Sequence, residues 1–114
     1  MEKVIIVGAG GHGRVVMDTA LSNSNLEVIG FLDDGDIENF LGVSKLGKIS
    51  DIENFKQIKF HIAIGNNSLR KELSKKIGIE NLITIRHSNS YISRDAEIGK
   101  GCFIGANVVI NSIR

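Results

Sequence analysis

A glycine-rich segment near the N-terminus has the residue types and spacing to bind a phosphate group. Residues 8–13 (GAGGHG) match the pattern G-x-G-x-x-G. In such a turn the first glycine permits a tight bend, and the second lets the backbone approach a diphosphate. The third lets the following helix pack closely on the strand. Free N–H groups at the start of that helix favour negative charge. The segment therefore predicts a site for a phosphate-bearing ligand.

The side chains near this turn leave two kinds of ligand open. Asp33 and Asp34 come about twenty residues after the turn, where an NAD-binding domain places its ribose-binding acid. His12 would face the phosphates, where dinucleotide sites usually carry nothing so bulky. It could donate to a phosphate or act near a sugar; the alternative is a solvent-exposed residue at a helix start. NAD thus fits the spacing, while His12 argues against it.

The pattern around the turn predicts a small α/β unit. Residues 4–7 and 28–32 are apolar runs typical of buried parallel strands, with a helical pattern between them. A third strand is expected over 60–64, then a helix from about Ser68 with Asn67 as N-cap and Gly78 as terminator. A last strand is expected over 82–85. The first domain is predicted to span residues 1–86, with about four strands.

The C-terminal residues follow a different period. Ile92, Ile98, Ile104 and Ile110 are spaced by six, which fits neither a helix nor a flat strand. Small residues recur four positions after an isoleucine, at Ala96, Cys102 and Val108. This doubled pattern is typical of hexapeptide-repeat parallel β-helices, with Cys102 as a small buried filler. Residues 87–114 are therefore predicted to begin a β-helix. Because its last coil would be incomplete, residues 106–114 are expected to be frayed or covered by another chain.

Composition excludes several classes of protein. The chain has 114 residues, of which 42% are hydrophobic and 24% charged, as in globular proteins. A net charge of +1 does not suggest a nucleic-acid or membrane partner. The single cysteine excludes an internal disulfide and a multi-cysteine zinc site, and no metal site is expected. The N-terminus has too few consecutive apolar residues for a signal peptide or membrane span, so a cytoplasmic protein is expected.

Taken in order, these motifs resemble one enzyme family. The resemblance rests on residues 6–13 (IVGAGGHG), 30–34 (GFLDD) and 63–67 (AIGNN), with Arg70, and on His87 before the repeats. The chain resembles the bacterial sugar O-/N-acyltransferases of the sialic-acid and bacillosamine pathways (NeuD/PglD type). It departs from that family at Ser88, where proline is usual, and at Arg114.

The resemblance implies a Rossmann-like domain that binds a nucleotide-sugar, followed by a left-handed β-helix that binds acetyl-CoA between the subunits of a homotrimer. Such enzymes serve surface-glycan biosynthesis. No cofactor is expected to be bound to this chain. The substrate-binding residues that carry over are Gly10, Gly11, His12, Asp33, Asp34, Gly65 and Ser68.

The resemblance also places the family's catalytic histidine beyond Arg114, with most of the acetyl-CoA site. The 114-residue chain alone is then expected to bind a nucleotide-sugar weakly and to lack acetyltransferase activity. Two other functions stay open. One is an NAD-binding oxidoreductase or redox-sensing domain, in which Asp33 or Asp34 bonds a ribose. The other is a non-catalytic product whose unpaired coil drives association.

Overall fold

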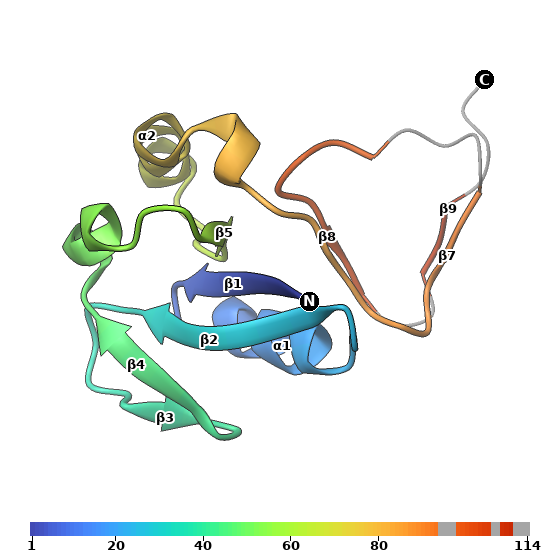
Figure 1. Cartoon of the computed structure of the whole chain (residues 1–114), viewed down its shortest axis with the longest axis horizontal. Helices are drawn as coiled ribbons and strands as arrows, with labels where there is room; N and C mark the ends of the chain where they lie inside the picture. Colours follow the sequence, from blue (N-terminus) through green and yellow to red (C-terminus); the bar gives the residue numbers. More distant parts are fainter. Residues whose placement is uncertain (94–97, 106–107, 111–114) are drawn as a thin grey trace.

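A five-stranded sheet forms the centre of the N-terminal part. The computed structural model describes residues 1–93, 98–105 and 108–110. The strand order is β3-β4-β2-β1-β5, and β3 and β4 are the antiparallel pair in an otherwise parallel sheet (Figure 1). The strands are β1 (Glu2–Val7), β2 (Leu26–Leu32), β3 (Asn39–Phe40), β4 (Val43–Gly47) and β5 (Lys59–Ile62). Three of these strands, β1, β2 and β5, correspond to predicted ones, whereas β3 and β4 are additional, and the strand expected over 82–85 is not part of this sheet.

Helices cover both faces of the sheet because β1 is apolar on both sides. Val4 and Ile6 of β1 pack in one buried cluster with Met17 of α1 (Gly11–Leu21). Ile5 and Val7 pack in a second cluster with residues of α2 (Asn67–Ile77) and the 3-10 helix η1 (Ile49–Asn54). Figure 1 shows α1 and α2 on opposite sides of the sheet. The result is the three-layer α/β/α arrangement of a Rossmann-like domain.

The ends of α2 differ slightly from expectation. The N-cap is Asn66, whose side chain accepts a hydrogen bond from the Leu69 N–H at 3.0 Å. The sequence offers two consecutive asparagines, and the second is the first helical residue instead. Gly78 ends the helix at a φ of 88°, as predicted, and its N–H donates to the Ser74 carbonyl. Gly78 therefore adopts the left-handed backbone that glycine tolerates best.

The sequence pattern between residues 36 and 59 suggests short extended pieces at 41–43 and 46–47, and the structure has the hairpin of β3 and β4 there. Leu41 and Gly42 connect the two strands, with φ values of 53° and 82°. Two consecutive positive φ angles are typical of the tight turns that join antiparallel strands. Leucine rarely adopts such a φ, so the sequence gives little sign of this turn.

The strand expected over 82–85 begins later, at β6 (Ile85–Arg86), which follows the short 3-10 helix η2 (Ile79–Asn81). Leu82 itself forms only an isolated parallel bridge with Phe60. β6 pairs in parallel with β8 (Phe103–Ile104), and β7 (Tyr91–Ile92) pairs in parallel with β9 (Val109–Ile110). Figure 1 shows the two pairs at the end of the molecule away from β3 and β4.

The pairing register in this region matches the six-residue period. Ile85 pairs with Phe103 and Tyr91 with Val109, so partners are 18 positions apart, or three repeats of six, in both pairs. Ile104 is buried at 5% exposure, whereas Val108 is 37% exposed, so not every repeat position points inward. Cys102 is partly buried. Ala96 and residues 106, 107 and 111–114 lie outside the described residues, and with them most of the segment expected to fray. The left-handed β-helix and the domain boundary at residue 86 stay predictions.

In the described ranges, no helix is both long enough and apolar enough to cross a membrane.

Candidate functional site

The glycine-rich turn joins β1 to α1, and two of its glycines are required by the fold. Gly8 has a φ of 105°, and a Cβ there would lie 2.7 Å from the Ala63 carbonyl oxygen. A Cβ on Gly13 would overlap the Gly8 carbonyl oxygen. These positions keep the helix close to the strand, as the sequence predicts for the first and last glycines of the pattern.

The other glycines at the predicted site are not required by the fold. A Cβ on Gly10, Gly11 or Gly65 would meet no atom within 4 Å, and none of these residues has a positive φ. Gly10 is the N-cap of α1, Gly11 is its first residue, and Gly65 follows β5. All three are exposed. The space that their missing side chains leave is therefore available for close approach by a ligand.

A cavity of about 530 Å³ lies where β5, the start of α1 and the loop before β8 meet. We call it the His12–Phe103 cavity. Its lining residues are His12, His61, Ile62, Ile64, Gly65, Arg70, Lys100, Gly101, Cys102 and Phe103. Arg70 and Lys100 bring positive charge, and none of the lining residues is acidic. This charge balance suits an anionic ligand.

One phenyl ring connects two histidines of the cavity. The ring of Phe103 lies 5.3 Å from that of His12 and 6.4 Å from that of His61, with edge-on geometry in both contacts. Edge-to-face contact at these separations is favourable for aromatic rings. His12 is exposed at the start of α1, whereas His61 is buried in β5. The first residues of β8 thus contact the glycine-rich turn and the sheet.

The surroundings of His61 disfavour its charged form. Its Nδ1 lies 2.9 Å from the Ile83 carbonyl oxygen. Burial lowers the pKa of His61 from its usual value of 6.5, and the charges of His12 and Arg70 lower it further, against the raising effect of the Ile83 carbonyl. The imidazole is therefore packed inside the sheet, with 1% of its residue surface exposed.

The two aspartates support the turn and the loop after β2. Asp33 Oδ1 accepts a hydrogen bond from the Ala9 N–H at 2.8 Å, inside the glycine-rich turn. Asp34 Oδ1 accepts from the Ile49 N–H at 3.0 Å, at the start of η1. Neither residue lines the His12–Phe103 cavity. Asp33 is nevertheless adjacent to the turn.

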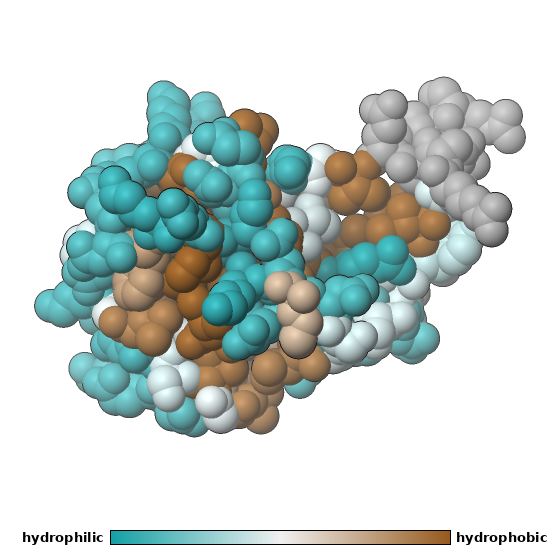
Figure 2. Space-filling model, in the orientation of Figure 1, coloured by the Kyte–Doolittle hydropathy of each residue, from teal (hydrophilic) through white to brown (hydrophobic). Residues whose placement is uncertain are grey.

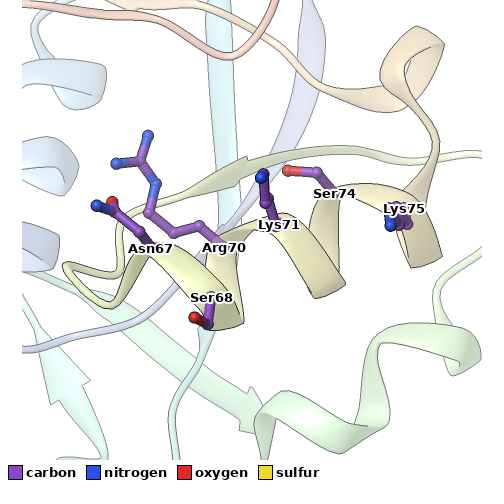
Figure 3. Close-up of a pocket in the computed structure, with 6 residues that line it drawn as sticks. All are labelled: Asn67, Ser68, Arg70, Lys71, Ser74 and Lys75. Carbon is purple, nitrogen blue, oxygen red and sulfur yellow. The ribbon is translucent and has the colours of Figure 1, made fainter.

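Ser68 lies apart from the other predicted residues. It lines an open groove of about 680 Å³ along α2, together with Asn67, Arg70, Lys71, Ser74 and Lys75. Figure 3 shows Ser68 and Arg70 pointing in opposite directions from the helix. Figure 2 shows mainly hydrophilic residues over α2. Of the groove residues, Arg70 is the one that also lines the His12–Phe103 cavity.

Of the seven predicted site residues, the structure brings His12 and Gly65 into one cavity. The other five are not among its lining residues: Gly10, Gly11, Asp33, Asp34 and Ser68. The structure adds His61, Lys100 and Phe103, which the site residues predicted from the sequence do not include. Arg70 is part of the motif 63–70 but not of the predicted site. Nothing local in the sequence marks Phe103, because its contacts with His12 and His61 join residues far apart in the chain.

In residues 1–93, 98–105 and 108–110, no group of three or more histidine, cysteine, aspartate and glutamate side chains is arranged to hold an ion.

Comparison with known proteins gives consistent results. The chain is 34% identical over 115 residues to the UDP-N-acetylbacillosamine N-acetyltransferase of Bacillus subtilis. The match covers 93% of this chain and 52% of that protein. The acetyltransferase domain of PglB from Neisseria gonorrhoeae matches with a TM-score of 0.83 and 30% identity, over 96% of this chain and 56% of that one. PerB from Caulobacter crescentus, solved in complex with CoA and GDP-perosamine, matches with a TM-score of 0.80 and 26% identity, over 98% of this chain and 55% of that one.

The chain spans about half the length of these relatives. The family model of the PglD N-terminal domain matches residues 3–77, which include β1 except its first residue, the glycine-rich turn, β5 and α2. The chain therefore belongs to the PglD N-terminal domain family.

Proposed function

We propose that this chain binds a nucleotide-sugar at the glycine-rich turn and in the His12–Phe103 cavity. The observation that carries the proposal is the open space at Gly10, Gly11 and Gly65 beside a cavity lined by Arg70 and Lys100. Backbone N–H groups at the start of α1 lack acceptors within the helix and favour a phosphate. The match to PerB, whose structure holds GDP-perosamine, supports a nucleotide-sugar as the ligand.

We further propose that the chain is the substrate-binding portion of an acetyl-CoA-dependent sugar or nucleotide-sugar acetyltransferase of bacterial surface-glycan biosynthesis. In this proposal the intact enzyme is a cytoplasmic homotrimer, and residues 87–114 begin its left-handed β-helix. The acceptor amine or hydroxyl must lose a proton as it attacks the thioester, so a base with a pKa near neutrality is required. We place that base outside residues 1–114.

Within this chain, the turn and the cavity hold and orient the acceptor. Cationic side chains and helix N–H groups bind the diphosphate. This binding fixes the position of the attached sugar relative to the protein. Such positioning lowers the entropic part of the barrier to transfer. Asp33 keeps the turn in shape through its bond to the Ala9 N–H. The chain thus supplies binding and orientation.

Thermal unfolding with matched ligands tests the binding proposal. The melting temperature is measured with UDP-N-acetylglucosamine, GDP-mannose and NADH at equal concentrations. We expect at least one nucleotide-sugar to raise it and NADH to leave it unchanged, because a ligand stabilises only the state that it binds. Stabilisation by NADH alone would favour the oxidoreductase alternative. Acetyl transfer by the 114-residue chain would contradict the placement of the base.

A further inference from the structure

One polar atom in the His12–Phe103 cavity has no role in holding a diphosphate: Nε2 of His61. The His61 side chain is 1% exposed, and its Nδ1 lies 2.9 Å from the Ile83 carbonyl oxygen. A carbonyl oxygen can only accept a hydrogen bond, so Nδ1 must carry the proton. In a neutral imidazole the other nitrogen is then an acceptor.

Nε2 opens into the cavity. The interactions of His61 are the bond to Ile83 and the ring contact with Phe103, and neither uses Nε2. Across the described ranges, every fully buried side-chain nitrogen or oxygen has a hydrogen-bond partner. Nε2 has none, so it must reach the cavity that His61 lines. A nearly buried imidazole thus directs one lone pair into this space.

The direction of that lone pair is fixed from two sides. The Ile83 carbonyl determines which nitrogen carries the proton, and Phe103 packs against the ring at 6.4 Å between centroids. The Ile83 N–H donates to the Phe60 carbonyl at 2.9 Å, which keeps the backbone of Ile83 next to β5. An acceptor held this way selects for a ligand donor at one position.

The required donor is a neutral group. Phosphate oxygens of a nucleotide diphosphate sugar carry no proton at neutral pH, and they would repel the lone pair of Nε2. Arg70 and Lys100 supply the positive charge for phosphates at other parts of the lining. The neutral donors of a nucleotide-sugar are the N–H groups of the base, the hydroxyls of the ribose, and the hydroxyl and amide N–H groups of the sugar. Only those of the sugar are absent from the free nucleoside diphosphate, so comparison with it distinguishes them.

We propose that His61 is a specificity-determining residue that accepts, at Nε2, a hydrogen bond from a hydroxyl or amide N–H of the sugar part of the ligand. This inference rests on the proposed nucleotide-sugar function. It assigns the sugar to the inner end of the cavity, next to β5. An analogue that lacks the donor leaves a buried acceptor without a partner, and such mismatches strongly reduce binding.

Calorimetric titration with two ligands tests this proposal. UDP and UDP-N-acetylglucosamine are titrated into the unchanged chain, into His61→Phe and into His87→Gln, which removes an imidazole from the turn before β7. Loss of one hydrogen bond should weaken binding of the nucleotide-sugar to His61→Phe about tenfold and leave that of UDP unchanged. Equal weakening of both ligands, or of neither, overturns the proposal.

Titration of the unchanged chain distinguishes failure of the proposed function from failure of the role of His61. If the chain binds neither ligand, nor any other nucleotide-sugar, the proposed function fails and this inference fails with it. If it binds the nucleotide-sugar but His61→Phe keeps the same preference over UDP, only the role of His61 fails.

A second measurement needs no variant and covers the case in which His61→Phe does not fold. Long-range ¹H–¹⁵N NMR spectra identify which ring nitrogen carries the proton. We expect protonated Nδ1, and a change in the Nε2 resonance with UDP-N-acetylglucosamine but not with UDP. A proton on Nε2 in the free protein, or an Nε2 resonance that the nucleotide-sugar does not move, overturns the proposal.

Discussion

The carboxylate of Asp33 at the end of β2 holds the backbone of Ala9 in the glycine-rich turn, with 2.8 Å between Asp33 Oδ1 and the Ala9 nitrogen. Its other oxygen accepts a hydrogen bond from the Gly35 N–H, also at 2.8 Å. A carboxylate can accept more than two such bonds, so these contacts do not exclude a ligand. The residue that spacing predicts as a ligand-binding acid is therefore also part of the support of the turn.

Asp33→Ala should lower the free energy of unfolding by about 1–3 kcal/mol, because it leaves the N–H of Ala9, which is 4% exposed, without its partner. Asp33→Asn should be less harmful, since its amide oxygen can still accept that bond. Urea unfolding of both variants gives the values, with Asp36→Ala at an exposed position as control. Equal stability of Asp33→Ala and Asp36→Ala would show that the bond does not support the turn.

The glycines of the turn should separate into two groups on substitution. Gly11→Val should abolish nucleotide-sugar binding and leave stability almost unchanged, because its Cβ meets no protein atom and would stand where a phosphate must approach. Gly11 lies in α1 without a positive φ, so backbone strain adds nothing to this effect.

Gly13→Ala should instead destabilise the fold, by about 1–3 kcal/mol for an overpacked site, since its Cβ would overlap the Gly8 carbonyl oxygen. Urea unfolding and calorimetric titration of the two variants make the comparison. Unchanged affinity of Gly11→Val for every nucleotide-sugar tested would mean that the turn is merely structural.

Stability should depend on pH through His61. Its pKa is lowered in the folded chain from 6.5, so the unfolded chain binds more protons between the folded value and 6.5. Stability therefore falls as pH drops below about 6.5 and stops falling below the folded pKa. Urea unfolding from about pH 5 to 7 should show a steeper loss at acid pH for the unchanged chain than for His61→Phe. Parallel curves would contradict a buried neutral imidazole.

The repeat positions should differ in their effect on stability. Ile104→Ala should lower the free energy of unfolding by about 2–5 kcal/mol, because Ile104 is only 5% exposed. Val108→Ala, at 37% exposure, should stay within about 0.5 kcal/mol. Thermal or urea unfolding distinguishes them. Similar losses in both variants would show that Val108 is packed more deeply in solution than its exposure of 37% indicates.

Local patterns in the sequence predict much of the α/β part. The apolar run of β1, the glycine-rich turn and the glycine at the end of α2 each have a local cause, and the structure confirms them. The β3–β4 turn is missed because Leu41 takes a backbone conformation that leucine rarely adopts. The late start of β6 is missed because its partner β8 comes from the repeat segment, 18 residues further along.

The candidate site is less predictable for the same reason. The glycine pattern predicts Gly10 as a site residue because backbone close to a phosphate needs glycine at fixed spacing, and Gly11 and His12 lie within the same turn. Gly65 is predicted by the family resemblance alone. The contact of His12 with Phe103, however, joins the start of α1 to a strand about 90 positions further along the chain, so it depends on the tertiary fold. The hydrogen-bond partner of His61 is the backbone carbonyl of Ile83, and because every residue type has such a carbonyl, the sequence does not predict this contact.

Amide NMR spectra recorded during titration with UDP-N-acetylglucosamine test the central claim most directly, because they locate the ligand on the unchanged chain. We predict that the resonances of Gly10, Gly11, Gly65 and Phe103 shift with a common affinity, and that those of Lys71 and Lys75 in the α2 groove do not. Shifts confined to the α2 groove, or no shift with any nucleotide-sugar tested, would contradict a nucleotide-sugar site at the glycine-rich turn.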